Sequence, residues 1–403
     1  MFRRQAQQKA FRTYLAALLN ERYRDRVARL VTNQSNGHYS GLRHFLRHAP
    51  WNAEALNEIR IAAMYSCRQT RPQRGFTLIV DDSSQPDSAA VASDIERQHV
   101  HHENIKTRGV LYATHLFDGV RNFPLDLIVA EYPPLESSTD FRASEEVRPE
   151  LVLKLVDRCM ERKHRPGAVV LSKPYSMDAG FLAALRSREL NYVGALSSTS
   201  QVACYLLGQS ELKHGLLRDI VSQIPPLMWV PIQEVARAPT VAETGPRWTT
   251  TLQFVLNGTD DKHWGLISLN APIPAAATEI TYLMTNCATR AFSPEWMWAT
   301  YTQRDRVREF YHAARSLLNL SEYRFDSVRS LTRHWMLLYV AYSFIVWHRL
   351  TGSLQRQTHR KIHSFSEAID AYRSILQPIP VGSNPFASAL ISSSSASLSD
   401  RTG

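Results

Sequence analysis

The chain has 403 residues, of which 44% are hydrophobic, so it is long enough for two or three domains with a substantial core. Its four cysteines are far apart and form no CxxC pair, which argues against a disulfide framework and a thiolate zinc site. The longest apolar run covers residues 336–347, whereas a membrane-spanning helix needs about 20 residues. We therefore predict a globular cytoplasmic protein in which this run is a buried helix and no segment crosses a membrane.

The net charge of +10 is concentrated near the N-terminus, where residues 1–75 hold 14 Lys and Arg against four acids. Apolar residues at helical spacing, such as Tyr14, Leu15 and Leu18, predict a small helical domain over residues 1–72. A basic module favours a polyanionic partner, because Lys and Arg release condensed counterions when they bind phosphates. A solvated basic face explains the charge equally well.

Short β-type runs at 76–82, 110–119 and 123–132 predict neighbouring antiparallel strands. Helical patterns at 148–164 and 178–189 then alternate with strand patterns at 167–172 and 191–197. This order, with acids at strand ends, predicts a ribonuclease H-like α/β core with a mixed sheet, which begins in residues 73–224. Another kind of alternating α/β fold is the alternative.

The composition changes in the second half of the chain. Residues 225–292 are rich in Pro, Trp and Thr and predict a β-rich insertion. Residues 293–375 return to helical patterns, including one continuous helix over 301–318, and are expected to complete the core. The Ser-rich residues 376–403 are expected to be a disordered tail.

Asp81 and Asp82 directly follow the apolar run FTLIV, so a carboxylate stands at the end of a buried strand. Mg²⁺ and Mn²⁺ prefer such hard oxygen ligands, and two of these ions can support phosphoryl transfer. The alternative is that the pair only starts the polar turn DDSSQPD. Further along, His115 and Asp118 in THLFDG are expected to satisfy backbone groups of a turn.

Several blocks resemble the DDE transposases of bacterial insertion sequences: HFLRHAPWNAEAL, IVDDS, THLFDGVRNFPLDLIVAEY and RHWMLLYVAYSF. A weaker match, IERQHVHHENIK, ends at Lys106, which we expect near DNA. The likeness covers most of residues 40–350. It implies metal-dependent cleavage and strand transfer of double-stranded DNA at transposon ends, with two Asp and one Glu holding Mg²⁺ or Mn²⁺. It also implies a homodimer on DNA and a nucleoid-associated location.

The C-terminal signature of that family is a helix with Tyr, then Arg three positions on, the catalytic Glu four further and Lys seven further. The matching residues here are Tyr301, Arg304, Arg308 and Arg315. The Glu position thus holds Arg308, and the neighbouring Glu309 is displaced by about 100° around a helix. By resemblance, Tyr301, Arg304 and Arg315 lie near DNA phosphates, although an ordinary basic helix face is the alternative.

The second Asp of the family should end the strand AVVL, where this chain has Ser172. The nearest acid, Asp178, is predicted to be the N-cap of the next helix. Of the three acids only Asp81 remains in place, so we predict a DNA-binding relative with impaired catalysis. Two alternatives stay open. One is an active transposase that uses Asp178 and Glu309 as displaced acids, and the other is a non-catalytic scaffold on the same fold.

Overall fold

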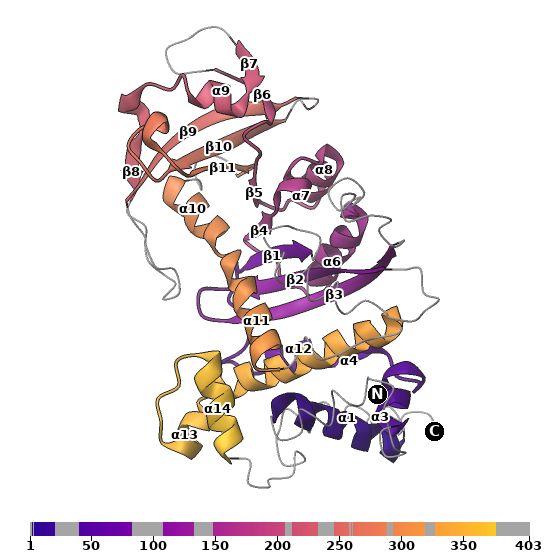
Figure 1. Cartoon of the computed structure of the whole chain (residues 1–403). Coiled ribbons are helices and arrows are strands. Elements are labelled where there is room, and N and C mark those ends of the chain that lie inside the picture. The colour runs from indigo at the N-terminus through magenta and orange to yellow at the C-terminus, as the bar shows by residue number, and fades with distance from the viewer. Residues whose placement is uncertain are drawn as a thin grey trace. The chain divides into compact units, whose positions relative to one another are not determined.

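The computed structural model describes residues 2, 4–20, 40–82, 108–132, 148–205, 212–232, 246–257, 259, 261–287, 293–318 and 327–375. Lys106 and the expected tail at 376–403 lie outside these residues. The chain divides into two compact units, whose elements are labelled in Figure 1. The first unit contains Met1–Gln73, Asp82–Glu145 and Arg306–Gly403, and the second contains Arg74–Asp81 and Glu146–Asp305.

The first unit combines helices from both ends of the sequence with one β-hairpin (Figure 1). The two strands of the hairpin pair antiparallel, as the sequence predicts, with a register shift between Thr114 and His115. The described elements of this unit are α1 (Gln5–Leu19), α3 (Ser40–Arg47), α4 (Ala53–Ser66), β2 (Arg108–Phe117), β3 (Asn122–Tyr132), α11 (Asp305–Ser316), α12 (Val328–Leu350), α13 (Ser353–Thr358) and α14 (Phe365–Ile375).

Helix α12 forms the centre of the first unit's core and packs against α1, α4 and β3. Its residues 333–346 are all buried, because apolar side chains occur around its whole circumference. The prediction of a buried helix over 336–347 is confirmed, apart from the partly exposed Trp347. Among the residues that the structure describes, none of the helices combines the length and the apolarity that crossing a bilayer requires.

Two buried arginines connect the N-terminal helices to the rest of this unit through hydrogen bonds. Arg60 on α4 donates to the Leu125 carbonyl oxygen at 2.6 Å and to Ser343 Oγ at 2.7 Å. Arg333 on α12 donates to the Leu46 carbonyl oxygen at 2.8 Å. A buried guanidinium needs such partners, since an unpaired buried charge is strongly destabilising. The helices of residues 1–72 therefore share a core with α12, and the domain boundary expected at residue 72 stays a prediction.

The second unit is built on a mixed sheet with strand order β1-β4-β5-β11-β10-β9-β6-β7 and with β8 beside β9. The pairs β1–β4 and β4–β5 are parallel, whereas the other pairs in this unit are antiparallel. Its strands are β1 (Thr77–Asp82), β4 (Ala168–Leu171), β5 (Tyr192–Ala195), β6 (Gln201–Tyr205), β7 (Leu212–Leu216), β8 (Val230–Ile232), β9 (Arg247–Leu256), β10 (Lys262–Leu269) and β11 (Ile280–Thr285). Its α-helices are α6 (Pro149–Glu161), α7 (Lys173–Ser176), α8 (Ala179–Ser187), α9 (Leu217–Val221) and α10 (Pro294–Thr302), with 3-10 turns at η4 (Pro226–Met228) and η5 (Pro274–Ala276).

The strands of residues 225–292 continue the same sheet. β11 pairs with β5, with Leu283 opposite Ala195, and β9 pairs with β6, with Val255 opposite Ala203. The β character expected for this region is present, while its division from the core at residue 225 stays a prediction. The mixed α/β class is confirmed, and the ribonuclease H-like detail stays a prediction.

The helix expected over 301–318 is divided in two, so the prediction of one continuous helix is wrong. α10 ends at Thr302, α11 begins at Asp305, and the division between the two units falls at Asp305/Arg306. The physical reason is packing: α10 buries Met297 in the core of the second unit, whereas α11 buries Phe310 in that of the first.

Candidate functional site

Two strand ends of the second unit meet at the positions that the resemblance assigns to the first two acids. β1 and β4 are parallel neighbours, with Ile79 opposite Val170. Asp81 and Ser172 each follow this pair by two residues, so both stand where these neighbouring parallel strands end. The structure therefore brings these two sequence-predicted positions to the same edge.

Ser172 contributes a hydroxyl group where the family has a carboxylate. The residue is only 5% exposed, and its Oγ has no hydrogen-bond partner among the described residues. Its carbonyl oxygen accepts from Ser176 Oγ at 3.1 Å, within the short helix α7 that follows. A neutral hydroxyl cannot offset the charge of a divalent ion as a carboxylate does. Position 172 thus carries no negative charge.

Asp178, the nearest acid along the chain, is the N-cap of α8, as the sequence predicts. Its Oδ1 accepts a hydrogen bond from the Phe181 backbone N–H at 2.8 Å. Such a cap satisfies a backbone donor that has no partner inside the helix. This carboxylate therefore already caps a helix, and a metal ion would have to compete with that hydrogen bond.

The four signature positions are divided between the two units. Tyr301 and Arg304 belong to the second unit, where Arg304 Nη1 donates to Tyr301 Oη at 2.9 Å. The Arg304 guanidinium also lies 5.9 Å from the centre of the Tyr301 ring. Arg308, which is exposed, and Arg315, which is partly buried, both lie on α11 of the first unit.

Glu309, the acid next to Arg308, is held by two neighbours in the first unit. Asn122 Nδ2 donates to Glu309 Oε2 at 3.0 Å, and the Arg306 guanidinium forms an ion pair with Oε1. Asn122 Nδ2 also donates to the Arg306 carbonyl oxygen at 2.9 Å. The carboxylate therefore joins α11 to the start of β3. Sequence reasoning missed both partners: the three-residue spacing of Arg306 and Glu309 on a helix was a usable signal, but nothing local pointed to Asn122.

The residue types at these positions do not fit a two-metal centre. At the three positions that the resemblance assigns to acids, the chain has the carboxylate of Asp81, the hydroxyl group of Ser172 and the guanidinium of Arg308. Among the described residues, no three Asp, Glu, His or Cys side chains lie close enough to hold one ion. Metal binding by Asp81 and Asp82 stays a prediction.

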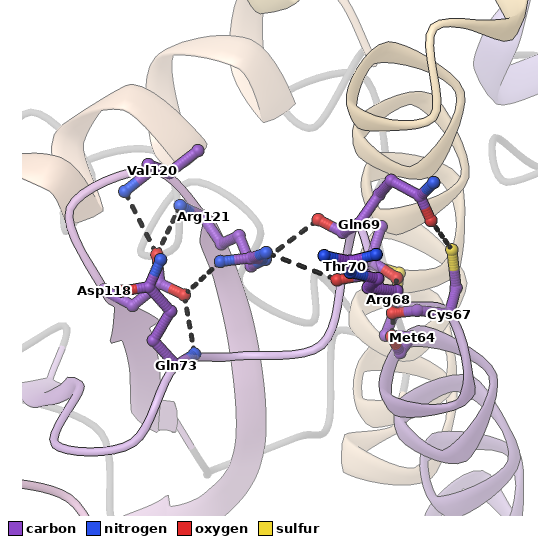
Figure 2. A network of polar contacts seen from close by, with 9 residues as sticks. All are labelled: Met64, Cys67, Arg68, Gln69, Thr70, Gln73, Asp118, Val120 and Arg121. Atoms are coloured by element: carbon purple, nitrogen blue, oxygen red, sulfur yellow. Dashed lines mark hydrogen bonds and ion pairs between the residues drawn. The ribbon is translucent and has the colours of Figure 1, made fainter.

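His115 is a core residue, so the expectation that it serves a turn is wrong. It lies within β2, which continues to Phe117, and its ring centre is 5.2 Å from that of Phe310. Burial, and then the nearby charge of Arg60, lower the pKa of His115 to about 3. The imidazole is therefore neutral at physiological pH. The expectation for Asp118 is confirmed, since its carboxylate accepts from backbone N–H groups of the turn (Figure 2).

A mixed α/β sheet with a carboxylate at the end of a buried strand is consistent with a DDE nuclease fold. The family model described as "DDE superfamily endonuclease" matches residues 1–205, just over half of the chain. The chain therefore belongs to the DDE superfamily of endonucleases. The matched stretch includes Asp81 and Ser172 but not residues 301–315, whose alignment with the C-terminal signature stays a prediction.

Similarity to a known protein links the chain to insertion-sequence transposases. The chain is 24% identical over 168 residues to the "Probable transposase for insertion sequence element IS701" of Microchaete diplosiphon. The aligned stretch is 40% of this chain and 42% of the relative, so less than half of the relative's length is spanned. Together with the family match, this similarity supports membership of the insertion-sequence DDE transposases.

Proposed function

We propose that this chain is a transposase-family protein that binds double-stranded DNA and has lost most of its metal-dependent catalysis. The observation that supports the proposal is the parallel pairing of strands β1 and β4, since Asp81 and Ser172 stand at the ends of these two neighbouring strands. At that edge of the sheet a second carboxylate would be needed to share a divalent ion. The chain offers a buried hydroxyl group instead.

The proposed loss extends to the third acid. If Arg308 stands at the Glu position, its charge within a few ångströms of a divalent ion costs on the order of 2 to 4 kcal/mol at an effective dielectric of 20. The alternative of displaced acids is disfavoured because both candidates are engaged. Asp178 would have to give up a helix cap worth roughly 1 kcal/mol, and Glu309 would have to leave Asn122 and Arg306.

The charge of the N-terminal helices supports the DNA-binding part of the proposal. Neither α1 nor α3 contains an acidic residue, and Lys9 and Arg12 are exposed on α1. Phosphate contacts need positioned cationic and hydroxyl groups but no metal. DNA binding can therefore outlast catalysis. By resemblance, Tyr301, Arg304 and Arg315 also lie near phosphates, and a homodimer on DNA is part of the same proposal.

Calorimetric titration of Mn²⁺ in the presence of duplex DNA tests the catalytic part. The double reversion Ser172→Asp with Arg308→Glu is expected to bind Mn²⁺, whereas the unchanged protein is not. A matched control, Ser172→Asn with Arg308→Gln, introduces side chains of the same size without the negative charges and should not bind. Binding by the unchanged protein that disappears in Asp81→Asn would show that displaced acids rebuild the site, and the proposed loss would be wrong.

A further inference from the structure

A long stretch of the first unit carries no acidic residue. Residues 327–366, which include all of α12 and α13, contain six Lys and Arg and four His but no Asp or Glu. Five of these basic side chains are exposed and follow one another closely after α12: Arg356, His359, Arg360, Lys361 and His363. We call residues 356–363, from the last turn of α13 to just before α14, the basic loop. Its positive charge therefore lies at the surface.

The basic loop is held at both ends within the first unit. Arg356 Nη1 donates to the Thr351 carbonyl oxygen at 3.0 Å, and Arg349 Nη1 on α12 donates to the His363 carbonyl oxygen at 3.2 Å. The His363 backbone N–H donates to Glu367 Oε2 at 2.7 Å. Both α13 and α14 pack against α12 (Figure 1). The loop thus has a defined path between its two ends.

The two acids that follow the basic loop are engaged on α14. Glu367 accepts the hydrogen bond from the His363 backbone N–H, which is the main cause that lowers the pKa of this carboxyl group. Asp370 forms an ion pair on its own helix at 3.9 Å. Within the described part of the chain, the side chains of residues 359–361 have no hydrogen-bond or ion-pair partner. Their charge is therefore left to ions or ligands from solution.

The backbone of His359 is also unusual. This residue caps the C-terminus of α13 with a φ of 54°, in the left-handed region. The turn before α13 meets the same need with Gly352, at a φ of 66°. A residue with a Cβ is strained in this region, whereas glycine is not. Stability alone thus favours glycine at position 359, and strain of this kind is typical of functional positions.

The composition of the basic loop favours one class of partner. Its exposed side chains are all polar, and its apolar residue Ile362 is partly buried. Protein interfaces are centred on buried apolar or aromatic side chains, whereas phosphate contacts need only positioned cationic and hydroxyl groups. Single-stranded nucleic acids are bound by stacking on aromatic rings, and the loop sequence RQTHRKIH has no Phe, Tyr or Trp. The loop therefore fits the backbone of a duplex.

We propose that the basic loop binds the phosphate backbone of duplex DNA, and that Arg360 and Lys361 make the contacts. This inference rests on the proposed function, which names DNA as the partner. It adds a contact surface that is separate from α1 and α3 and from the signature residues 301–315. Because phosphates carry no sequence information, the loop contributes affinity for any duplex.

The salt dependence of DNA binding tests the loop. Fluorescence anisotropy with a labelled duplex of arbitrary sequence compares the full native chain with the double variant Arg360→Gln, Lys361→Gln. The slope of log affinity against log salt should fall by about 0.9 for each lost phosphate contact, and so by up to about 1.8. The matched control Arg360→Lys, Lys361→Arg keeps both charges and should keep the native slope. All three proteins should melt at the same temperature, since no described partner is lost.

Lysine acetylation separates direct contact from long-range attraction. Mass spectrometry of the native chain measures how fast a water-soluble reagent acetylates Lys361. Bound duplex should slow this reaction several-fold, because an amine in contact with a phosphate is shielded from the reagent. A salt concentration that releases the DNA should restore the original rate.

The two measurements distinguish failure of the loop from failure of the proposed function. A native slope that the double Gln variant retains overturns the proposal but leaves DNA binding by the chain standing, and an acidic protein surface would then match the loop better. A lower slope without protection of Lys361 also overturns it, since the charge would act only at long range. If the native chain shows no salt-dependent binding, both the loop and the DNA-binding part of the proposed function are wrong.

Discussion

His263 forms a buried polar cluster with Arg186 and Tyr192 in the second unit. Its Nε2 lies 2.6 Å from Arg186 Nη2 and 2.9 Å from Tyr192 Oη. A guanidinium can only donate, so this nitrogen must be the acceptor and the ring must be neutral. Burial, and then the charge of Arg186, lower the pKa of His263 to about 4, and burial raises the pKa of Tyr192 to about 12. Asp261 balances the arginine through an ion pair.

We expect this cluster to make the protein less stable in mild acid. Because the pKa of His263 is about 4 when folded and near 6.5 when unfolded, the unfolded chain binds more protons between these values. The contribution of His263 is therefore fully present above pH 6.5 and is lost as the pH falls towards 4, with an upper limit of about 3 kcal/mol.

Urea denaturation at pH 7 and pH 4.5 measures this effect, with His263→Gln as the comparison, since glutamine can accept the same bonds but does not titrate in this range. The pH-dependent loss should be smaller in His263→Gln than in the native protein. Equal losses would show that His263 does not titrate as its surroundings imply. The other buried histidines of the described residues, His115, His334 and His348, are present in both proteins and contribute equally to both.

The short helix α7 packs against strand β5 at Gly194. A Cβ built on Gly194 would lie 2.1 Å from Ser176 Oγ and 3.0 Å from Ser176 Cβ, both closer than side-chain carbons pack. Glycine here allows the helix that follows Ser172 to approach the sheet. The helix that begins directly after Ser172 is thus in close contact with strand β5.

Gly194→Ala is expected to destabilise the protein by about 1–3 kcal/mol, because the extra methyl group would collide with Ser176 and push α7 away from β5. Gly41→Ala is the matched control: nothing lies within 4 Å of the position that its added methyl group would take, and alanine favours a helix such as α3. Thermal melting should show a loss for the first variant and no loss for the second. Equal melting temperatures would mean that α7 is not tightly seated.

At the scale of the whole molecule, the excess of basic residues near the N-terminus lies partly on helices that pack in the core of the first unit. Lys9 and Arg12 are exposed on α1, whose buried Tyr14 hydroxyl pairs with His334 Nδ1 at 2.8 Å. A phosphate-binding face on α1 would therefore be held by α12. A scaffold protein on the same fold would not need such a face.

Duplex DNA affinity is expected to fall linearly with the logarithm of the salt concentration. Changing Lys9 and Arg12 to Gln should reduce the slope by about 0.9 for each phosphate that the variant no longer neutralises. Lys9→Arg with Arg12→Lys keeps both charges at these exposed positions and should leave the slope near the native value. Affinity that does not change with salt would favour the scaffold alternative.

The amino-acid sequence by itself determined the features that nearest neighbours and periodicity control. The N-cap at Asp178, the turn at Asp118, the buried helix over 336–347 and the acid that ends β1 could all be predicted, because each depends on a few adjacent residues. The same local information supports the mixed α/β class and the resemblance that the family match confirms.

Only the tertiary structure decided which segments meet. The parallel pairing of β1 and β4 brings the strand ends that carry Asp81 and Ser172 to one edge of the sheet, and Glu309 is bound by Asn122, which is 187 residues away in sequence. Likewise, the helical pattern over 301–318 is divided because its two halves bury their apolar faces in different cores. No local pattern encodes these contacts, since they depend on the packing of distant segments. The neighbours and hydrogen-bond partners of each carboxylate therefore depend on the fold as a whole.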